Sequence, residues 1–133
     1  MKYDISALGN ALVDTQYMVD HDFLDEIGLE ADSMTLASAE EHSPIIDKLQ
    51  SMGVESVSDC GGSATNSLVA ASYYGSKCHH VCRVANDEDG KKYLESLQKA
   101  GVQHIGYSKE DSEMPTGKCL IFVTPDAKRT MSS

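Results

Sequence analysis

The stretch that decides the fold is Asp59-Cys60-Gly61-Gly62-Ser63-Ala64-Thr65-Asn66-Ser67, in which a β-prone segment runs through two glycines into a helical pattern. Paired glycines at a strand-to-helix junction leave backbone N–H groups accessible and let a ligand approach without meeting a Cβ. The helix N-terminus that follows adds unpaired donors and the positive end of the helix dipole. Asn66 would present its amide to such a ligand. A plain tight turn with a buried Asn fits the same residues, because glycine pairs are common in turns.

A second glycine ends the first predicted strand, which is expected to be buried and covers residues 3–8, and begins the run Gly9-Asn10-Ala11-Leu12-Val13-Asp14. In an open α/β sheet, ligands bind beyond the carboxyl ends of the strands, so we expect both glycine junctions to lie at that edge. The Asp14 carboxylate and the amides of Asn10 and Asn66 can hydrogen-bond neutral hydroxyls, whereas Asp14 would repel a phosphate. The site is therefore predicted to bind a polyol. The sequence contains neither a P-loop motif nor a dinucleotide fingerprint, so ATP would be held elsewhere.

At these residues the sequence resembles the ribokinase and adenosine kinase group of carbohydrate and nucleoside kinases, the PfkB family. The resemblance covers essentially all 133 residues. Five motifs carry it in order along the chain: Gly9-Asn10-x-x-x-Asp14, Val19-Asp20-His21-Asp22-Phe23-Leu24-Asp25, Gly61-Gly62-Ser63-x-x-Asn66-Ser67, Val84-Ala85-Asn86-Asp87-Glu88-x-Gly90 and Pro115-Thr116-Gly117-Lys118-Cys119. The second and the last of them are closer to adenosine kinases. Leu68 and Ala85 depart from the family pattern, which bears on helix packing and subfamily rather than on a contact group.

The resemblance implies a kinase that transfers the γ-phosphoryl group of ATP to a primary hydroxymethyl group of a nucleoside or sugar. By motif position, Asn10, Asp14 and Asn66 would bind hydroxyl groups of the sugar. Gly61 and Gly62 would contribute backbone contacts.

For three further residues the resemblance suggests a functional role, and an ordinary structural role is an alternative. Leu12 and Leu36 stand where adenosine kinases place apolar residues against the base, and they fit at least as well as core or lid leucines. Arg129 stands where some relatives carry an arginine close to the transferred phosphate. A solvated arginine after a turn is the simpler interpretation.

The family's catalytic base, which the resemblance places in a C-terminal turn of the form G-A-G-D, has no counterpart in the 133 residues. ATP and magnesium would then be bound mainly by a C-terminal part, and we expect this chain to be the N-terminal part of a larger kinase that is inactive alone. The remainder of the same polypeptide would be its partner. The predicted strand 117–124, the turn 125–128 and a strand beginning at Arg129 read as a hairpin cut in its second arm.

The hydrophobic periodicity predicts an α/β fold with a parallel sheet, flanking helices and a small lid sheet, and the resemblance implies that this fold is ribokinase-like. The strands of the parallel sheet are expected at 3–8, 79–84 and 104–107, and the helices at 22–27, 39–52, 64–74 and 87–100. The lid strands are expected at 13–19, 34–36 and 117–124. Ser38 and Glu41 form a capping-box pattern before the second helix. Such a lid would exclude water from the reaction, and its edges could pair in a homodimer.

Composition limits the partners and the compartment. The net charge is −10, from 21 acidic and 11 basic residues, which argues against nucleic acid or an anionic membrane as a partner. No stretch approaches the roughly 20 apolar residues that span a bilayer, and Met1-Lys2-Tyr3-Asp4 lacks the start of a signal peptide. We therefore expect a cytoplasmic protein.

The four cysteines, Cys60, Cys78, Cys82 and Cys119, are widely scattered, so reduced thiols are expected. The run Cys78-His79-His80-Val81-Cys82 contains four potential metal ligands. On a strand these side chains alternate between the two faces and cannot all reach one tetrahedral metal, so no metal site is predicted.

Three functions remain open at this point. The chain is the substrate-binding and lid portion of an adenosine-kinase-like enzyme, the same portion of a ribokinase-like sugar kinase, or a non-enzymatic domain that binds a polyol or a protein. Stacking residues would separate the first two, and the only phenylalanines, Phe23 and Phe122, favour neither.

Overall fold

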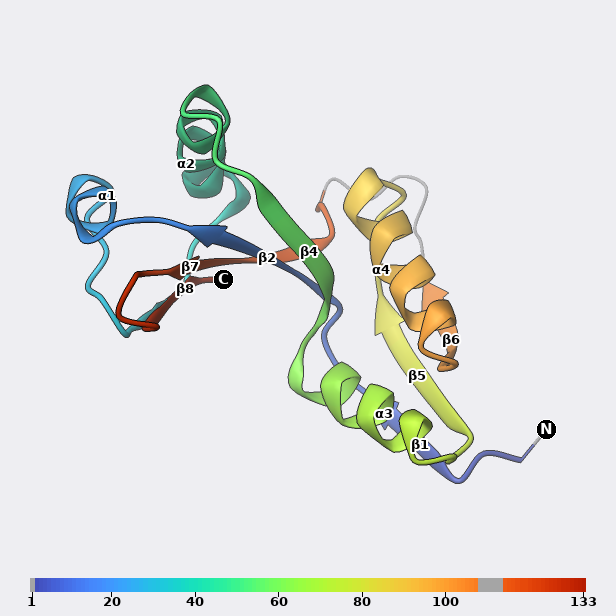
Figure 1. Cartoon of the computed structure of the whole chain (residues 1–133). Helices are drawn as coiled ribbons and strands as arrows, with labels where there is room; N and C mark the ends of the chain where they lie inside the picture. Colours follow the sequence, from blue (N-terminus) through green and yellow to red (C-terminus); the bar gives the residue numbers. More distant parts are fainter. Residues whose placement is uncertain (1, 108–113) are drawn as a thin grey trace. The chain divides into compact units, whose positions relative to one another are not determined.

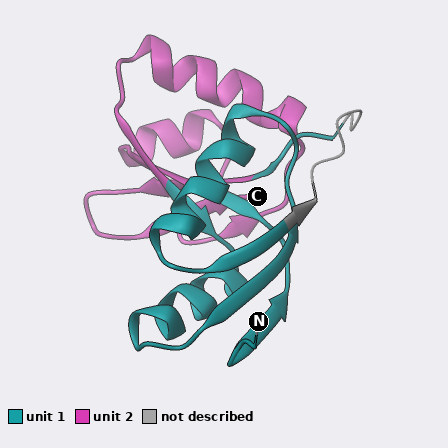
Figure 2. Ribbon diagram, turned by 90° about the vertical axis from the view of Figure 1, so that its right-hand side faces the viewer, with its two compact units in different colours: residues 1–13, 59–117 teal, residues 14–58, 118–133 magenta. Residues whose placement is uncertain are grey.

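The computed structural model describes residues 2–107 and 114–133 (Figure 1). The chain divides into two compact units, and each is built from separate stretches of sequence (Figure 2). The first unit consists of residues 1–13 and 59–117, and the second of residues 14–58 and 118–133. Within the described part of the chain, no helix is both long enough and apolar enough to cross a membrane.

The first unit contains a three-stranded parallel sheet in the order β1-β5-β6. Its strands are β1 (Ile5–Leu8), β5 (Cys78–Arg83) and β6 (Gln103–Tyr107). Helix α3 (Ser63–Tyr73) packs on β1 and β5, and α4 (Glu88–Lys99) packs on β6. The parallel sheet with crossover helices is thus confirmed, with boundaries within one residue or two of those predicted.

The core of this unit lies between the sheet and the two helices. Leu68 of α3 and Tyr93 and Leu97 of α4 are buried there against the strands. The prediction of a buried first strand was wrong, since Leu8 is 82% exposed and Ile5 42% exposed. The physical reason is that β1 lies at the edge of the described sheet and pairs with β5 alone.

The second sheet has five strands in the order β3-β8-β7-β2-β4. They are β2 (Leu12–Met18), β3 (Met34–Thr35), β4 (Ser56–Gly61), β7 (Gly117–Val123) and β8 (Arg129–Ser132). Strands β7 and β8 form the predicted antiparallel hairpin, with Val123 opposite Arg129. The three segments expected as lid strands, 13–19, 34–36 and 117–124, all contribute to this sheet.

Strand β4 was assigned to neither sheet from the sequence. Only its glycine junction was placed, at the carboxyl edge of the parallel sheet near the end of β1, and the structure pairs the strand itself with β2. Its first four residues, Ser56-Val57-Ser58-Asp59, are all exposed. A strand this polar does not fit the interior of a parallel sheet, whose strands are buried on both faces and read as apolar runs. An edge position on the second sheet suits it.

Helices α1 (His21–Glu26) and α2 (Ala39–Ser51) bury one face of the second sheet. The core there contains Phe23, Leu49 and Phe122. Helix α2 begins with the predicted capping box, because the Ser38 side chain accepts from the backbone N–H of Glu41 and the Glu41 carboxylate accepts from the backbone N–H of Ser38. The pKa of Glu41 is lowered, chiefly because its carboxylate accepts the hydrogen bond from the backbone N–H of Ser38.

Candidate functional site

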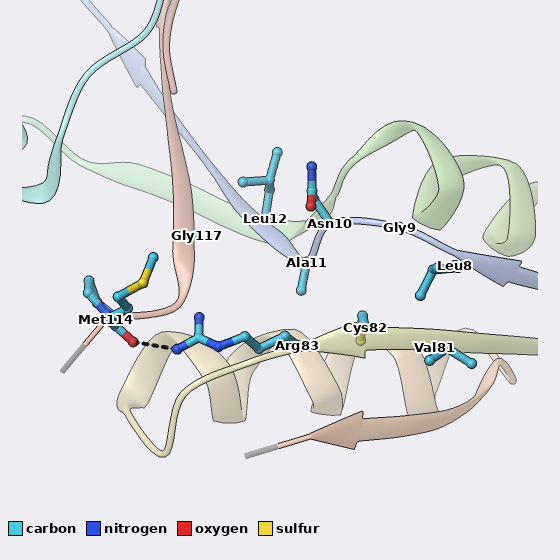
Figure 3. Close-up of a pocket in the computed structure, with 11 residues that line it drawn as sticks. Leu8, Gly9, Asn10, Ala11, Leu12, Val81, Cys82, Arg83, Met114 and Gly117 are labelled. Carbon is cyan, nitrogen blue, oxygen red and sulfur yellow. Dashed lines mark hydrogen bonds between the residues drawn. The ribbon is translucent and has the colours of Figure 1, made fainter. Parts of the chain in front are cut away.

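A pocket of about 560 Å³ opens in the first unit where β1 and β5 end (Figure 3). The residues on one side belong to the run Leu8–Leu12, which leads from β1 into β2. The other side is formed by the end of β5, including Arg83, and by the segment that enters β7. Arg83 donates through Nη2 to the carbonyl oxygen of Met114 at 3.0 Å, which joins the two segments that form this second side. Asn10 and Leu12, both predicted as site residues, line it.

The Gly61-Gly62 turn lies directly against the first glycine junction. Gly62 has φ +101°, a conformation that side chains with a Cβ rarely adopt, and a Cβ there would come within 2.7 Å of the Asn10 carbonyl oxygen. Gly61 is buried, whereas the amides of Asn10 and Asn66 are exposed. The structure therefore brings together the two junctions that the sequence paired. The structure explains the glycine at position 62 differently from the sequence. The sequence predicted that a ligand would occupy the position of a Cβ, whereas in the structure the backbone of Asn10 lies there.

Behind the Gly62 turn lies a buried polar cluster. Thr65, which is fully buried, has its hydroxyl oxygen 3.1 Å from Nε2 of His80 and 2.7 Å from the hydroxyl oxygen of Tyr93. Nδ1 of His80 lies 3.3 Å from the carbonyl oxygen of Ala7. The cluster connects β1, β5, α3 and α4, so it ties the frame of the turn to the sheet.

A second polar cluster joins two motifs that the sequence singled out separately. Asp87, the N-cap of α4, accepts from the backbone N–H of Gly90 at 2.7 Å and from the Thr116 hydroxyl at 2.6 Å through Oδ1. Its Oδ2 accepts from the backbone N–H of Thr116 at 2.9 Å. The Thr116 hydroxyl oxygen in turn accepts from the backbone N–H of Ala85. One carboxylate thus holds the pocket segment at residues 114–117 against the start of a helix.

The same cluster determines the pKa of Asp87. Partial burial alone would raise it, but the hydrogen bonds from the side chain and backbone of Thr116 and from Gly90 outweigh burial, and the pKa lies below the ordinary 3.8. A carboxyl whose pKa is lowered by folding stabilises the protein fully above its unfolded-state pKa. That contribution is lost as the pH falls through the folded-state pKa.

We therefore expect Asp87→Asn to lower the free energy of unfolding by about 2 kcal/mol near pH 7, because a neutral amide loses the charge-assisted bonds and turns N–H groups toward Thr116. The difference from wild type should stay constant down to about pH 4 and shrink below it. Urea unfolding of both proteins between pH 3 and pH 8, on the full-length protein, measures this.

Glu88→Gln provides the matched control, because Glu88 stands in the same first turn and its ion pair with Lys92 is exposed. An exposed pair of this kind contributes at most about 0.5 kcal/mol. Equal losses in the two variants, or a difference for Asp87→Asn that persists unchanged into acid, would contradict the role given to Asp87.

Three predicted site residues belong to the second unit and are described within it. Asp14, half-buried on β2, and Arg129, exposed at the start of β8, both act on the Cys119 thiol. Burial raises the pKa of Cys119, Asp14 raises it further, and Ser133 and Arg129 oppose this. Leu36, 79% exposed, follows β3 and lines a separate pocket of about 510 Å³ between α1 and α2. The two predicted leucines, Leu12 and Leu36, therefore lie in different pockets and different units.

The side chains of the run Cys78–Cys82 alternate as predicted. Cys78, His80 and Cys82 are buried, while His79 stacks on Tyr3 with ring centroids 4.7 Å apart. Burial raises the pKa of both thiols, Cys78 and Cys82, and none of the four cysteines, all of which lie in the described ranges, takes part in a disulfide. Within residues 2–107 and 114–133, no three His, Cys, Asp or Glu side chains are placed to hold a metal.

Sequence reasoning missed Arg83, the pairing of Asp87 with Thr116, and the cluster of Thr65, His80 and Tyr93. One signal was available: alternation along β5 puts His80 on the same face as Cys78 and Cys82, toward the helices. The remaining partners are 15 to 31 residues apart in sequence, and no local pattern connects them.

Residues 33–133 match the pfkB family of carbohydrate kinases. Adenosine kinase 1 of Arabidopsis thaliana is 31% identical over 120 residues, which cover 87% of this chain and 33% of that protein. The crystal structure of a probable sugar kinase from Rhizobium etli superposes with a TM-score of 0.85 at 27% identity, covering 98% of this chain and 38% of that one. The adenosine kinase of Sinorhizobium meliloti gives a TM-score of 0.81 at 28% identity, covering 99% and 39%.

The chain spans about a third of the length of the curated relatives it matches. Within that span its α/β fold is ribokinase-like, with a parallel sheet and flanking helices that superpose on those of sugar and nucleoside kinases. The match to the family extends over most of the chain and includes the Gly61-Gly62 turn, the Asp87 cluster and the Thr116 segment. The chain therefore belongs to the pfkB family of carbohydrate kinases.

Proposed function

We propose that this chain carries the acceptor-binding portion of a kinase that transfers the γ-phosphoryl group of ATP to a primary hydroxyl of a nucleoside, with adenosine as the first candidate. One observation carries the proposal: the exposed amides of Asn10 and Asn66 come from two segments that meet where Gly62 lies against the Asn10 carbonyl. Neutral amides suit the hydroxyls of a sugar better than they suit a phosphate. Leu12 adds an apolar wall beside Asn10, against which a base can pack.

A sugar acceptor is the second candidate. The adenosine kinases of Arabidopsis favour the nucleoside, whereas the strong superposition on the Rhizobium protein, described as a probable sugar kinase, favours a sugar. Both acceptors present the same hydroxyls to Asn10 and Asn66, so these two residues do not discriminate. A third possibility is a domain that binds a polyol or a protein without catalysis.

On the resemblance to the family alone, Asp14 is proposed to contact a hydroxyl of the acceptor, Leu36 the base and Arg129 the transferred phosphate. We assign the binding of ATP and magnesium mainly to the remainder of the kinase polypeptide, because the chain spans only about a third of the length of its curated relatives. The five-stranded sheet serves as the lid, which orients the acceptor and excludes water from phosphoryl transfer. Residues 1–133 alone are accordingly expected to bind the acceptor without phosphorylating it.

Phosphorylation assays on the full-length protein with Mg-ATP, and with adenosine and ribose as acceptors, test the proposal. We expect adenosine to be phosphorylated with the higher kcat/KM. Asp14→Ala should raise KM for the acceptor about tenfold to a hundredfold, because a hydrogen bond to a charged group contributes about 1.5–3 kcal/mol.

Gln16→Ala is the control for Asp14→Ala, because Gln16 lies two residues further along β2 and is exposed. It should leave KM unchanged. A preference for ribose would move the assignment to the sugar kinase, and an unchanged KM for Asp14→Ala would remove Asp14 from the site. Acceptor binding without any phosphorylation by the full-length protein would support the non-enzymatic domain.

A further inference from the structure

The buried imidazole of His80 contacts both segments that carry the candidate amides. Nδ1 lies 3.3 Å from the carbonyl oxygen of Ala7, three residues before Asn10. Nε2 lies 3.1 Å from the hydroxyl oxygen of Thr65, the residue next to Asn66. His80 is 0% exposed, so its ring is held entirely by protein groups.

The chemistry of the hydrogen-bonding partners determines which group donates and which accepts in each bond of this cluster. A carbonyl oxygen only accepts, so Nδ1 of His80 carries the proton and donates to Ala7. In the neutral ring Nε2 then accepts, which requires the Thr65 hydroxyl to donate to it. The Thr65 oxygen keeps its acceptor capacity for the Tyr93 hydroxyl at 2.7 Å. Because the Thr65 proton is engaged at His80, the Tyr93 hydroxyl is the donor of this bond, and burial raises the pKa of Tyr93, so it keeps the proton that the bond requires.

The two segments also touch directly beside the ring. A Cβ on Gly9 would lie 2.6 Å from Cβ of Ala64 and 3.5 Å from Cε1 of His80. The segment before Asn10 is therefore packed against the first turn of α3, with the imidazole filling the space behind the contact. Movement of either segment would break a hydrogen bond to a buried ring that has no access to water as a substitute.

We propose that His80 and Thr65 are positioning residues that hold the Asn10 segment and the first turn of α3 in a single arrangement, so that the amides of Asn10 and Asn66 meet the acceptor together. The inference rests on the proposed function. Neither His80 nor Thr65 reaches the acceptor, since both are buried behind the turn. Tyr93 completes the hydrogen bonding of Thr65 but lies outside the link between the two segments.

Kinetics of three variants of the full-length protein test the link. Thr65→Val keeps the volume and removes the hydroxyl, and it should raise KM for the acceptor about tenfold while kcat stays within about twofold. Thr65→Ser restores the hydroxyl and should bring KM back to the wild-type value. Tyr93→Phe is the matched control, because it removes a buried hydroxyl of the same cluster and leaves the bond between Thr65 and His80 in place. Its KM should be unchanged even where its thermal stability falls as much as that of Thr65→Val.

A second measurement does not depend on activity. In wild type, the amide of Gly9 donates to Val81 at 3.2 Å and the amide of Asn66 donates to Gly62 at 2.9 Å. Thr65→Val should accelerate hydrogen exchange at both amides, whereas Tyr93→Phe should accelerate neither. Nitrogen NMR of the imidazole rings should show His80 with its proton on Nδ1.

The outcomes separate the two proposals. If the wild-type protein phosphorylated neither adenosine nor ribose, the proposed function would be refuted. The hydrogen-exchange data alone would then test the positioning role of His80 and Thr65. Exchange that accelerates at Asn66 but not at Gly9, a proton on Nε2 of His80, or KM values that merely follow the stability of all three variants would overturn the positioning role.

Discussion

Gly62→Ala is expected to destabilise the protein by about 4 kcal/mol and to abolish acceptor binding at ordinary concentrations. The first cause is conformational, because φ +101° is a region that side chains with a Cβ rarely adopt. The second is steric, because the new Cβ would lie 2.7 Å from the Asn10 carbonyl oxygen, which is backbone and cannot turn away. To relieve this collision Asn10 would have to move, and Asn10 is one of the residues that we propose to bind the acceptor.

Gly75→Ala separates the two causes. Gly75 has a similar φ of +93° and ends α3, but nothing lies within 4 Å of the position of its Cβ. It should therefore lose only the conformational part, about 1–2 kcal/mol, with normal acceptor binding. Urea unfolding and isothermal titration calorimetry with adenosine on the full-length protein measure both effects. If the two variants were equally stable, the contact between Gly62 and Asn10 would contribute nothing.

Gly90→Ala is expected to destabilise the protein by about 3 kcal/mol, although helix propensity alone would make alanine the better residue by about 1 kcal/mol. Gly90 stands in the first turn of α4, and a Cβ there would lie 2.2 Å from the carbonyl oxygen of Ala85. It would also lie 2.9 Å from the Thr116 hydroxyl and 3.0 Å from the Asp87 carboxylate. The substitution would push apart the cluster that holds residues 114–117.

Lys91→Ala, at the exposed next position of the same helix, serves as the control and should change stability by less than about 0.5 kcal/mol. The sign of the Gly90→Ala effect is the sharp part of the prediction. A more stable variant in thermal and urea unfolding would show that the start of α4 can move away from Ala85 at no cost, and that the cluster is not rigid.

Elements whose signals are local could be predicted from the sequence. Ser38 and Glu41 are three residues apart, and so are Asp87 and Gly90, so the caps of α2 and α4 follow from spacing alone. The alternation of buried and exposed residues along β2 is a property of one strand. The motifs around Asn10, Gly62 and Asn66 identified the family for the same reason, because each motif is contiguous.

Placements that depend on distant partners could not be predicted. The sequence assigned β4 to neither sheet, because a strand of six residues carries no record of its neighbour. Its partner strand is β2, and Thr15 and Ser58, whose hydroxyls share a hydrogen bond, are 43 residues apart in the sequence. The sequence marked Gly62 as a glycine open to a ligand, and only the position of the Asn10 carbonyl showed what excludes a side chain there.

By itself the sequence determined which segments are helices and strands, where the helices begin, and which family supplies the motifs, because caps, alternation and motifs act within a few residues. Only the tertiary structure decided that Asp87 holds Thr116, that His80 joins Ala7 to Thr65, and that Gly62 lies against Asn10. In each of these contacts the two residues are at least 15 positions apart in the sequence. They form only when burial brings the segments together, since a buried polar group must find its partner wherever the fold places one.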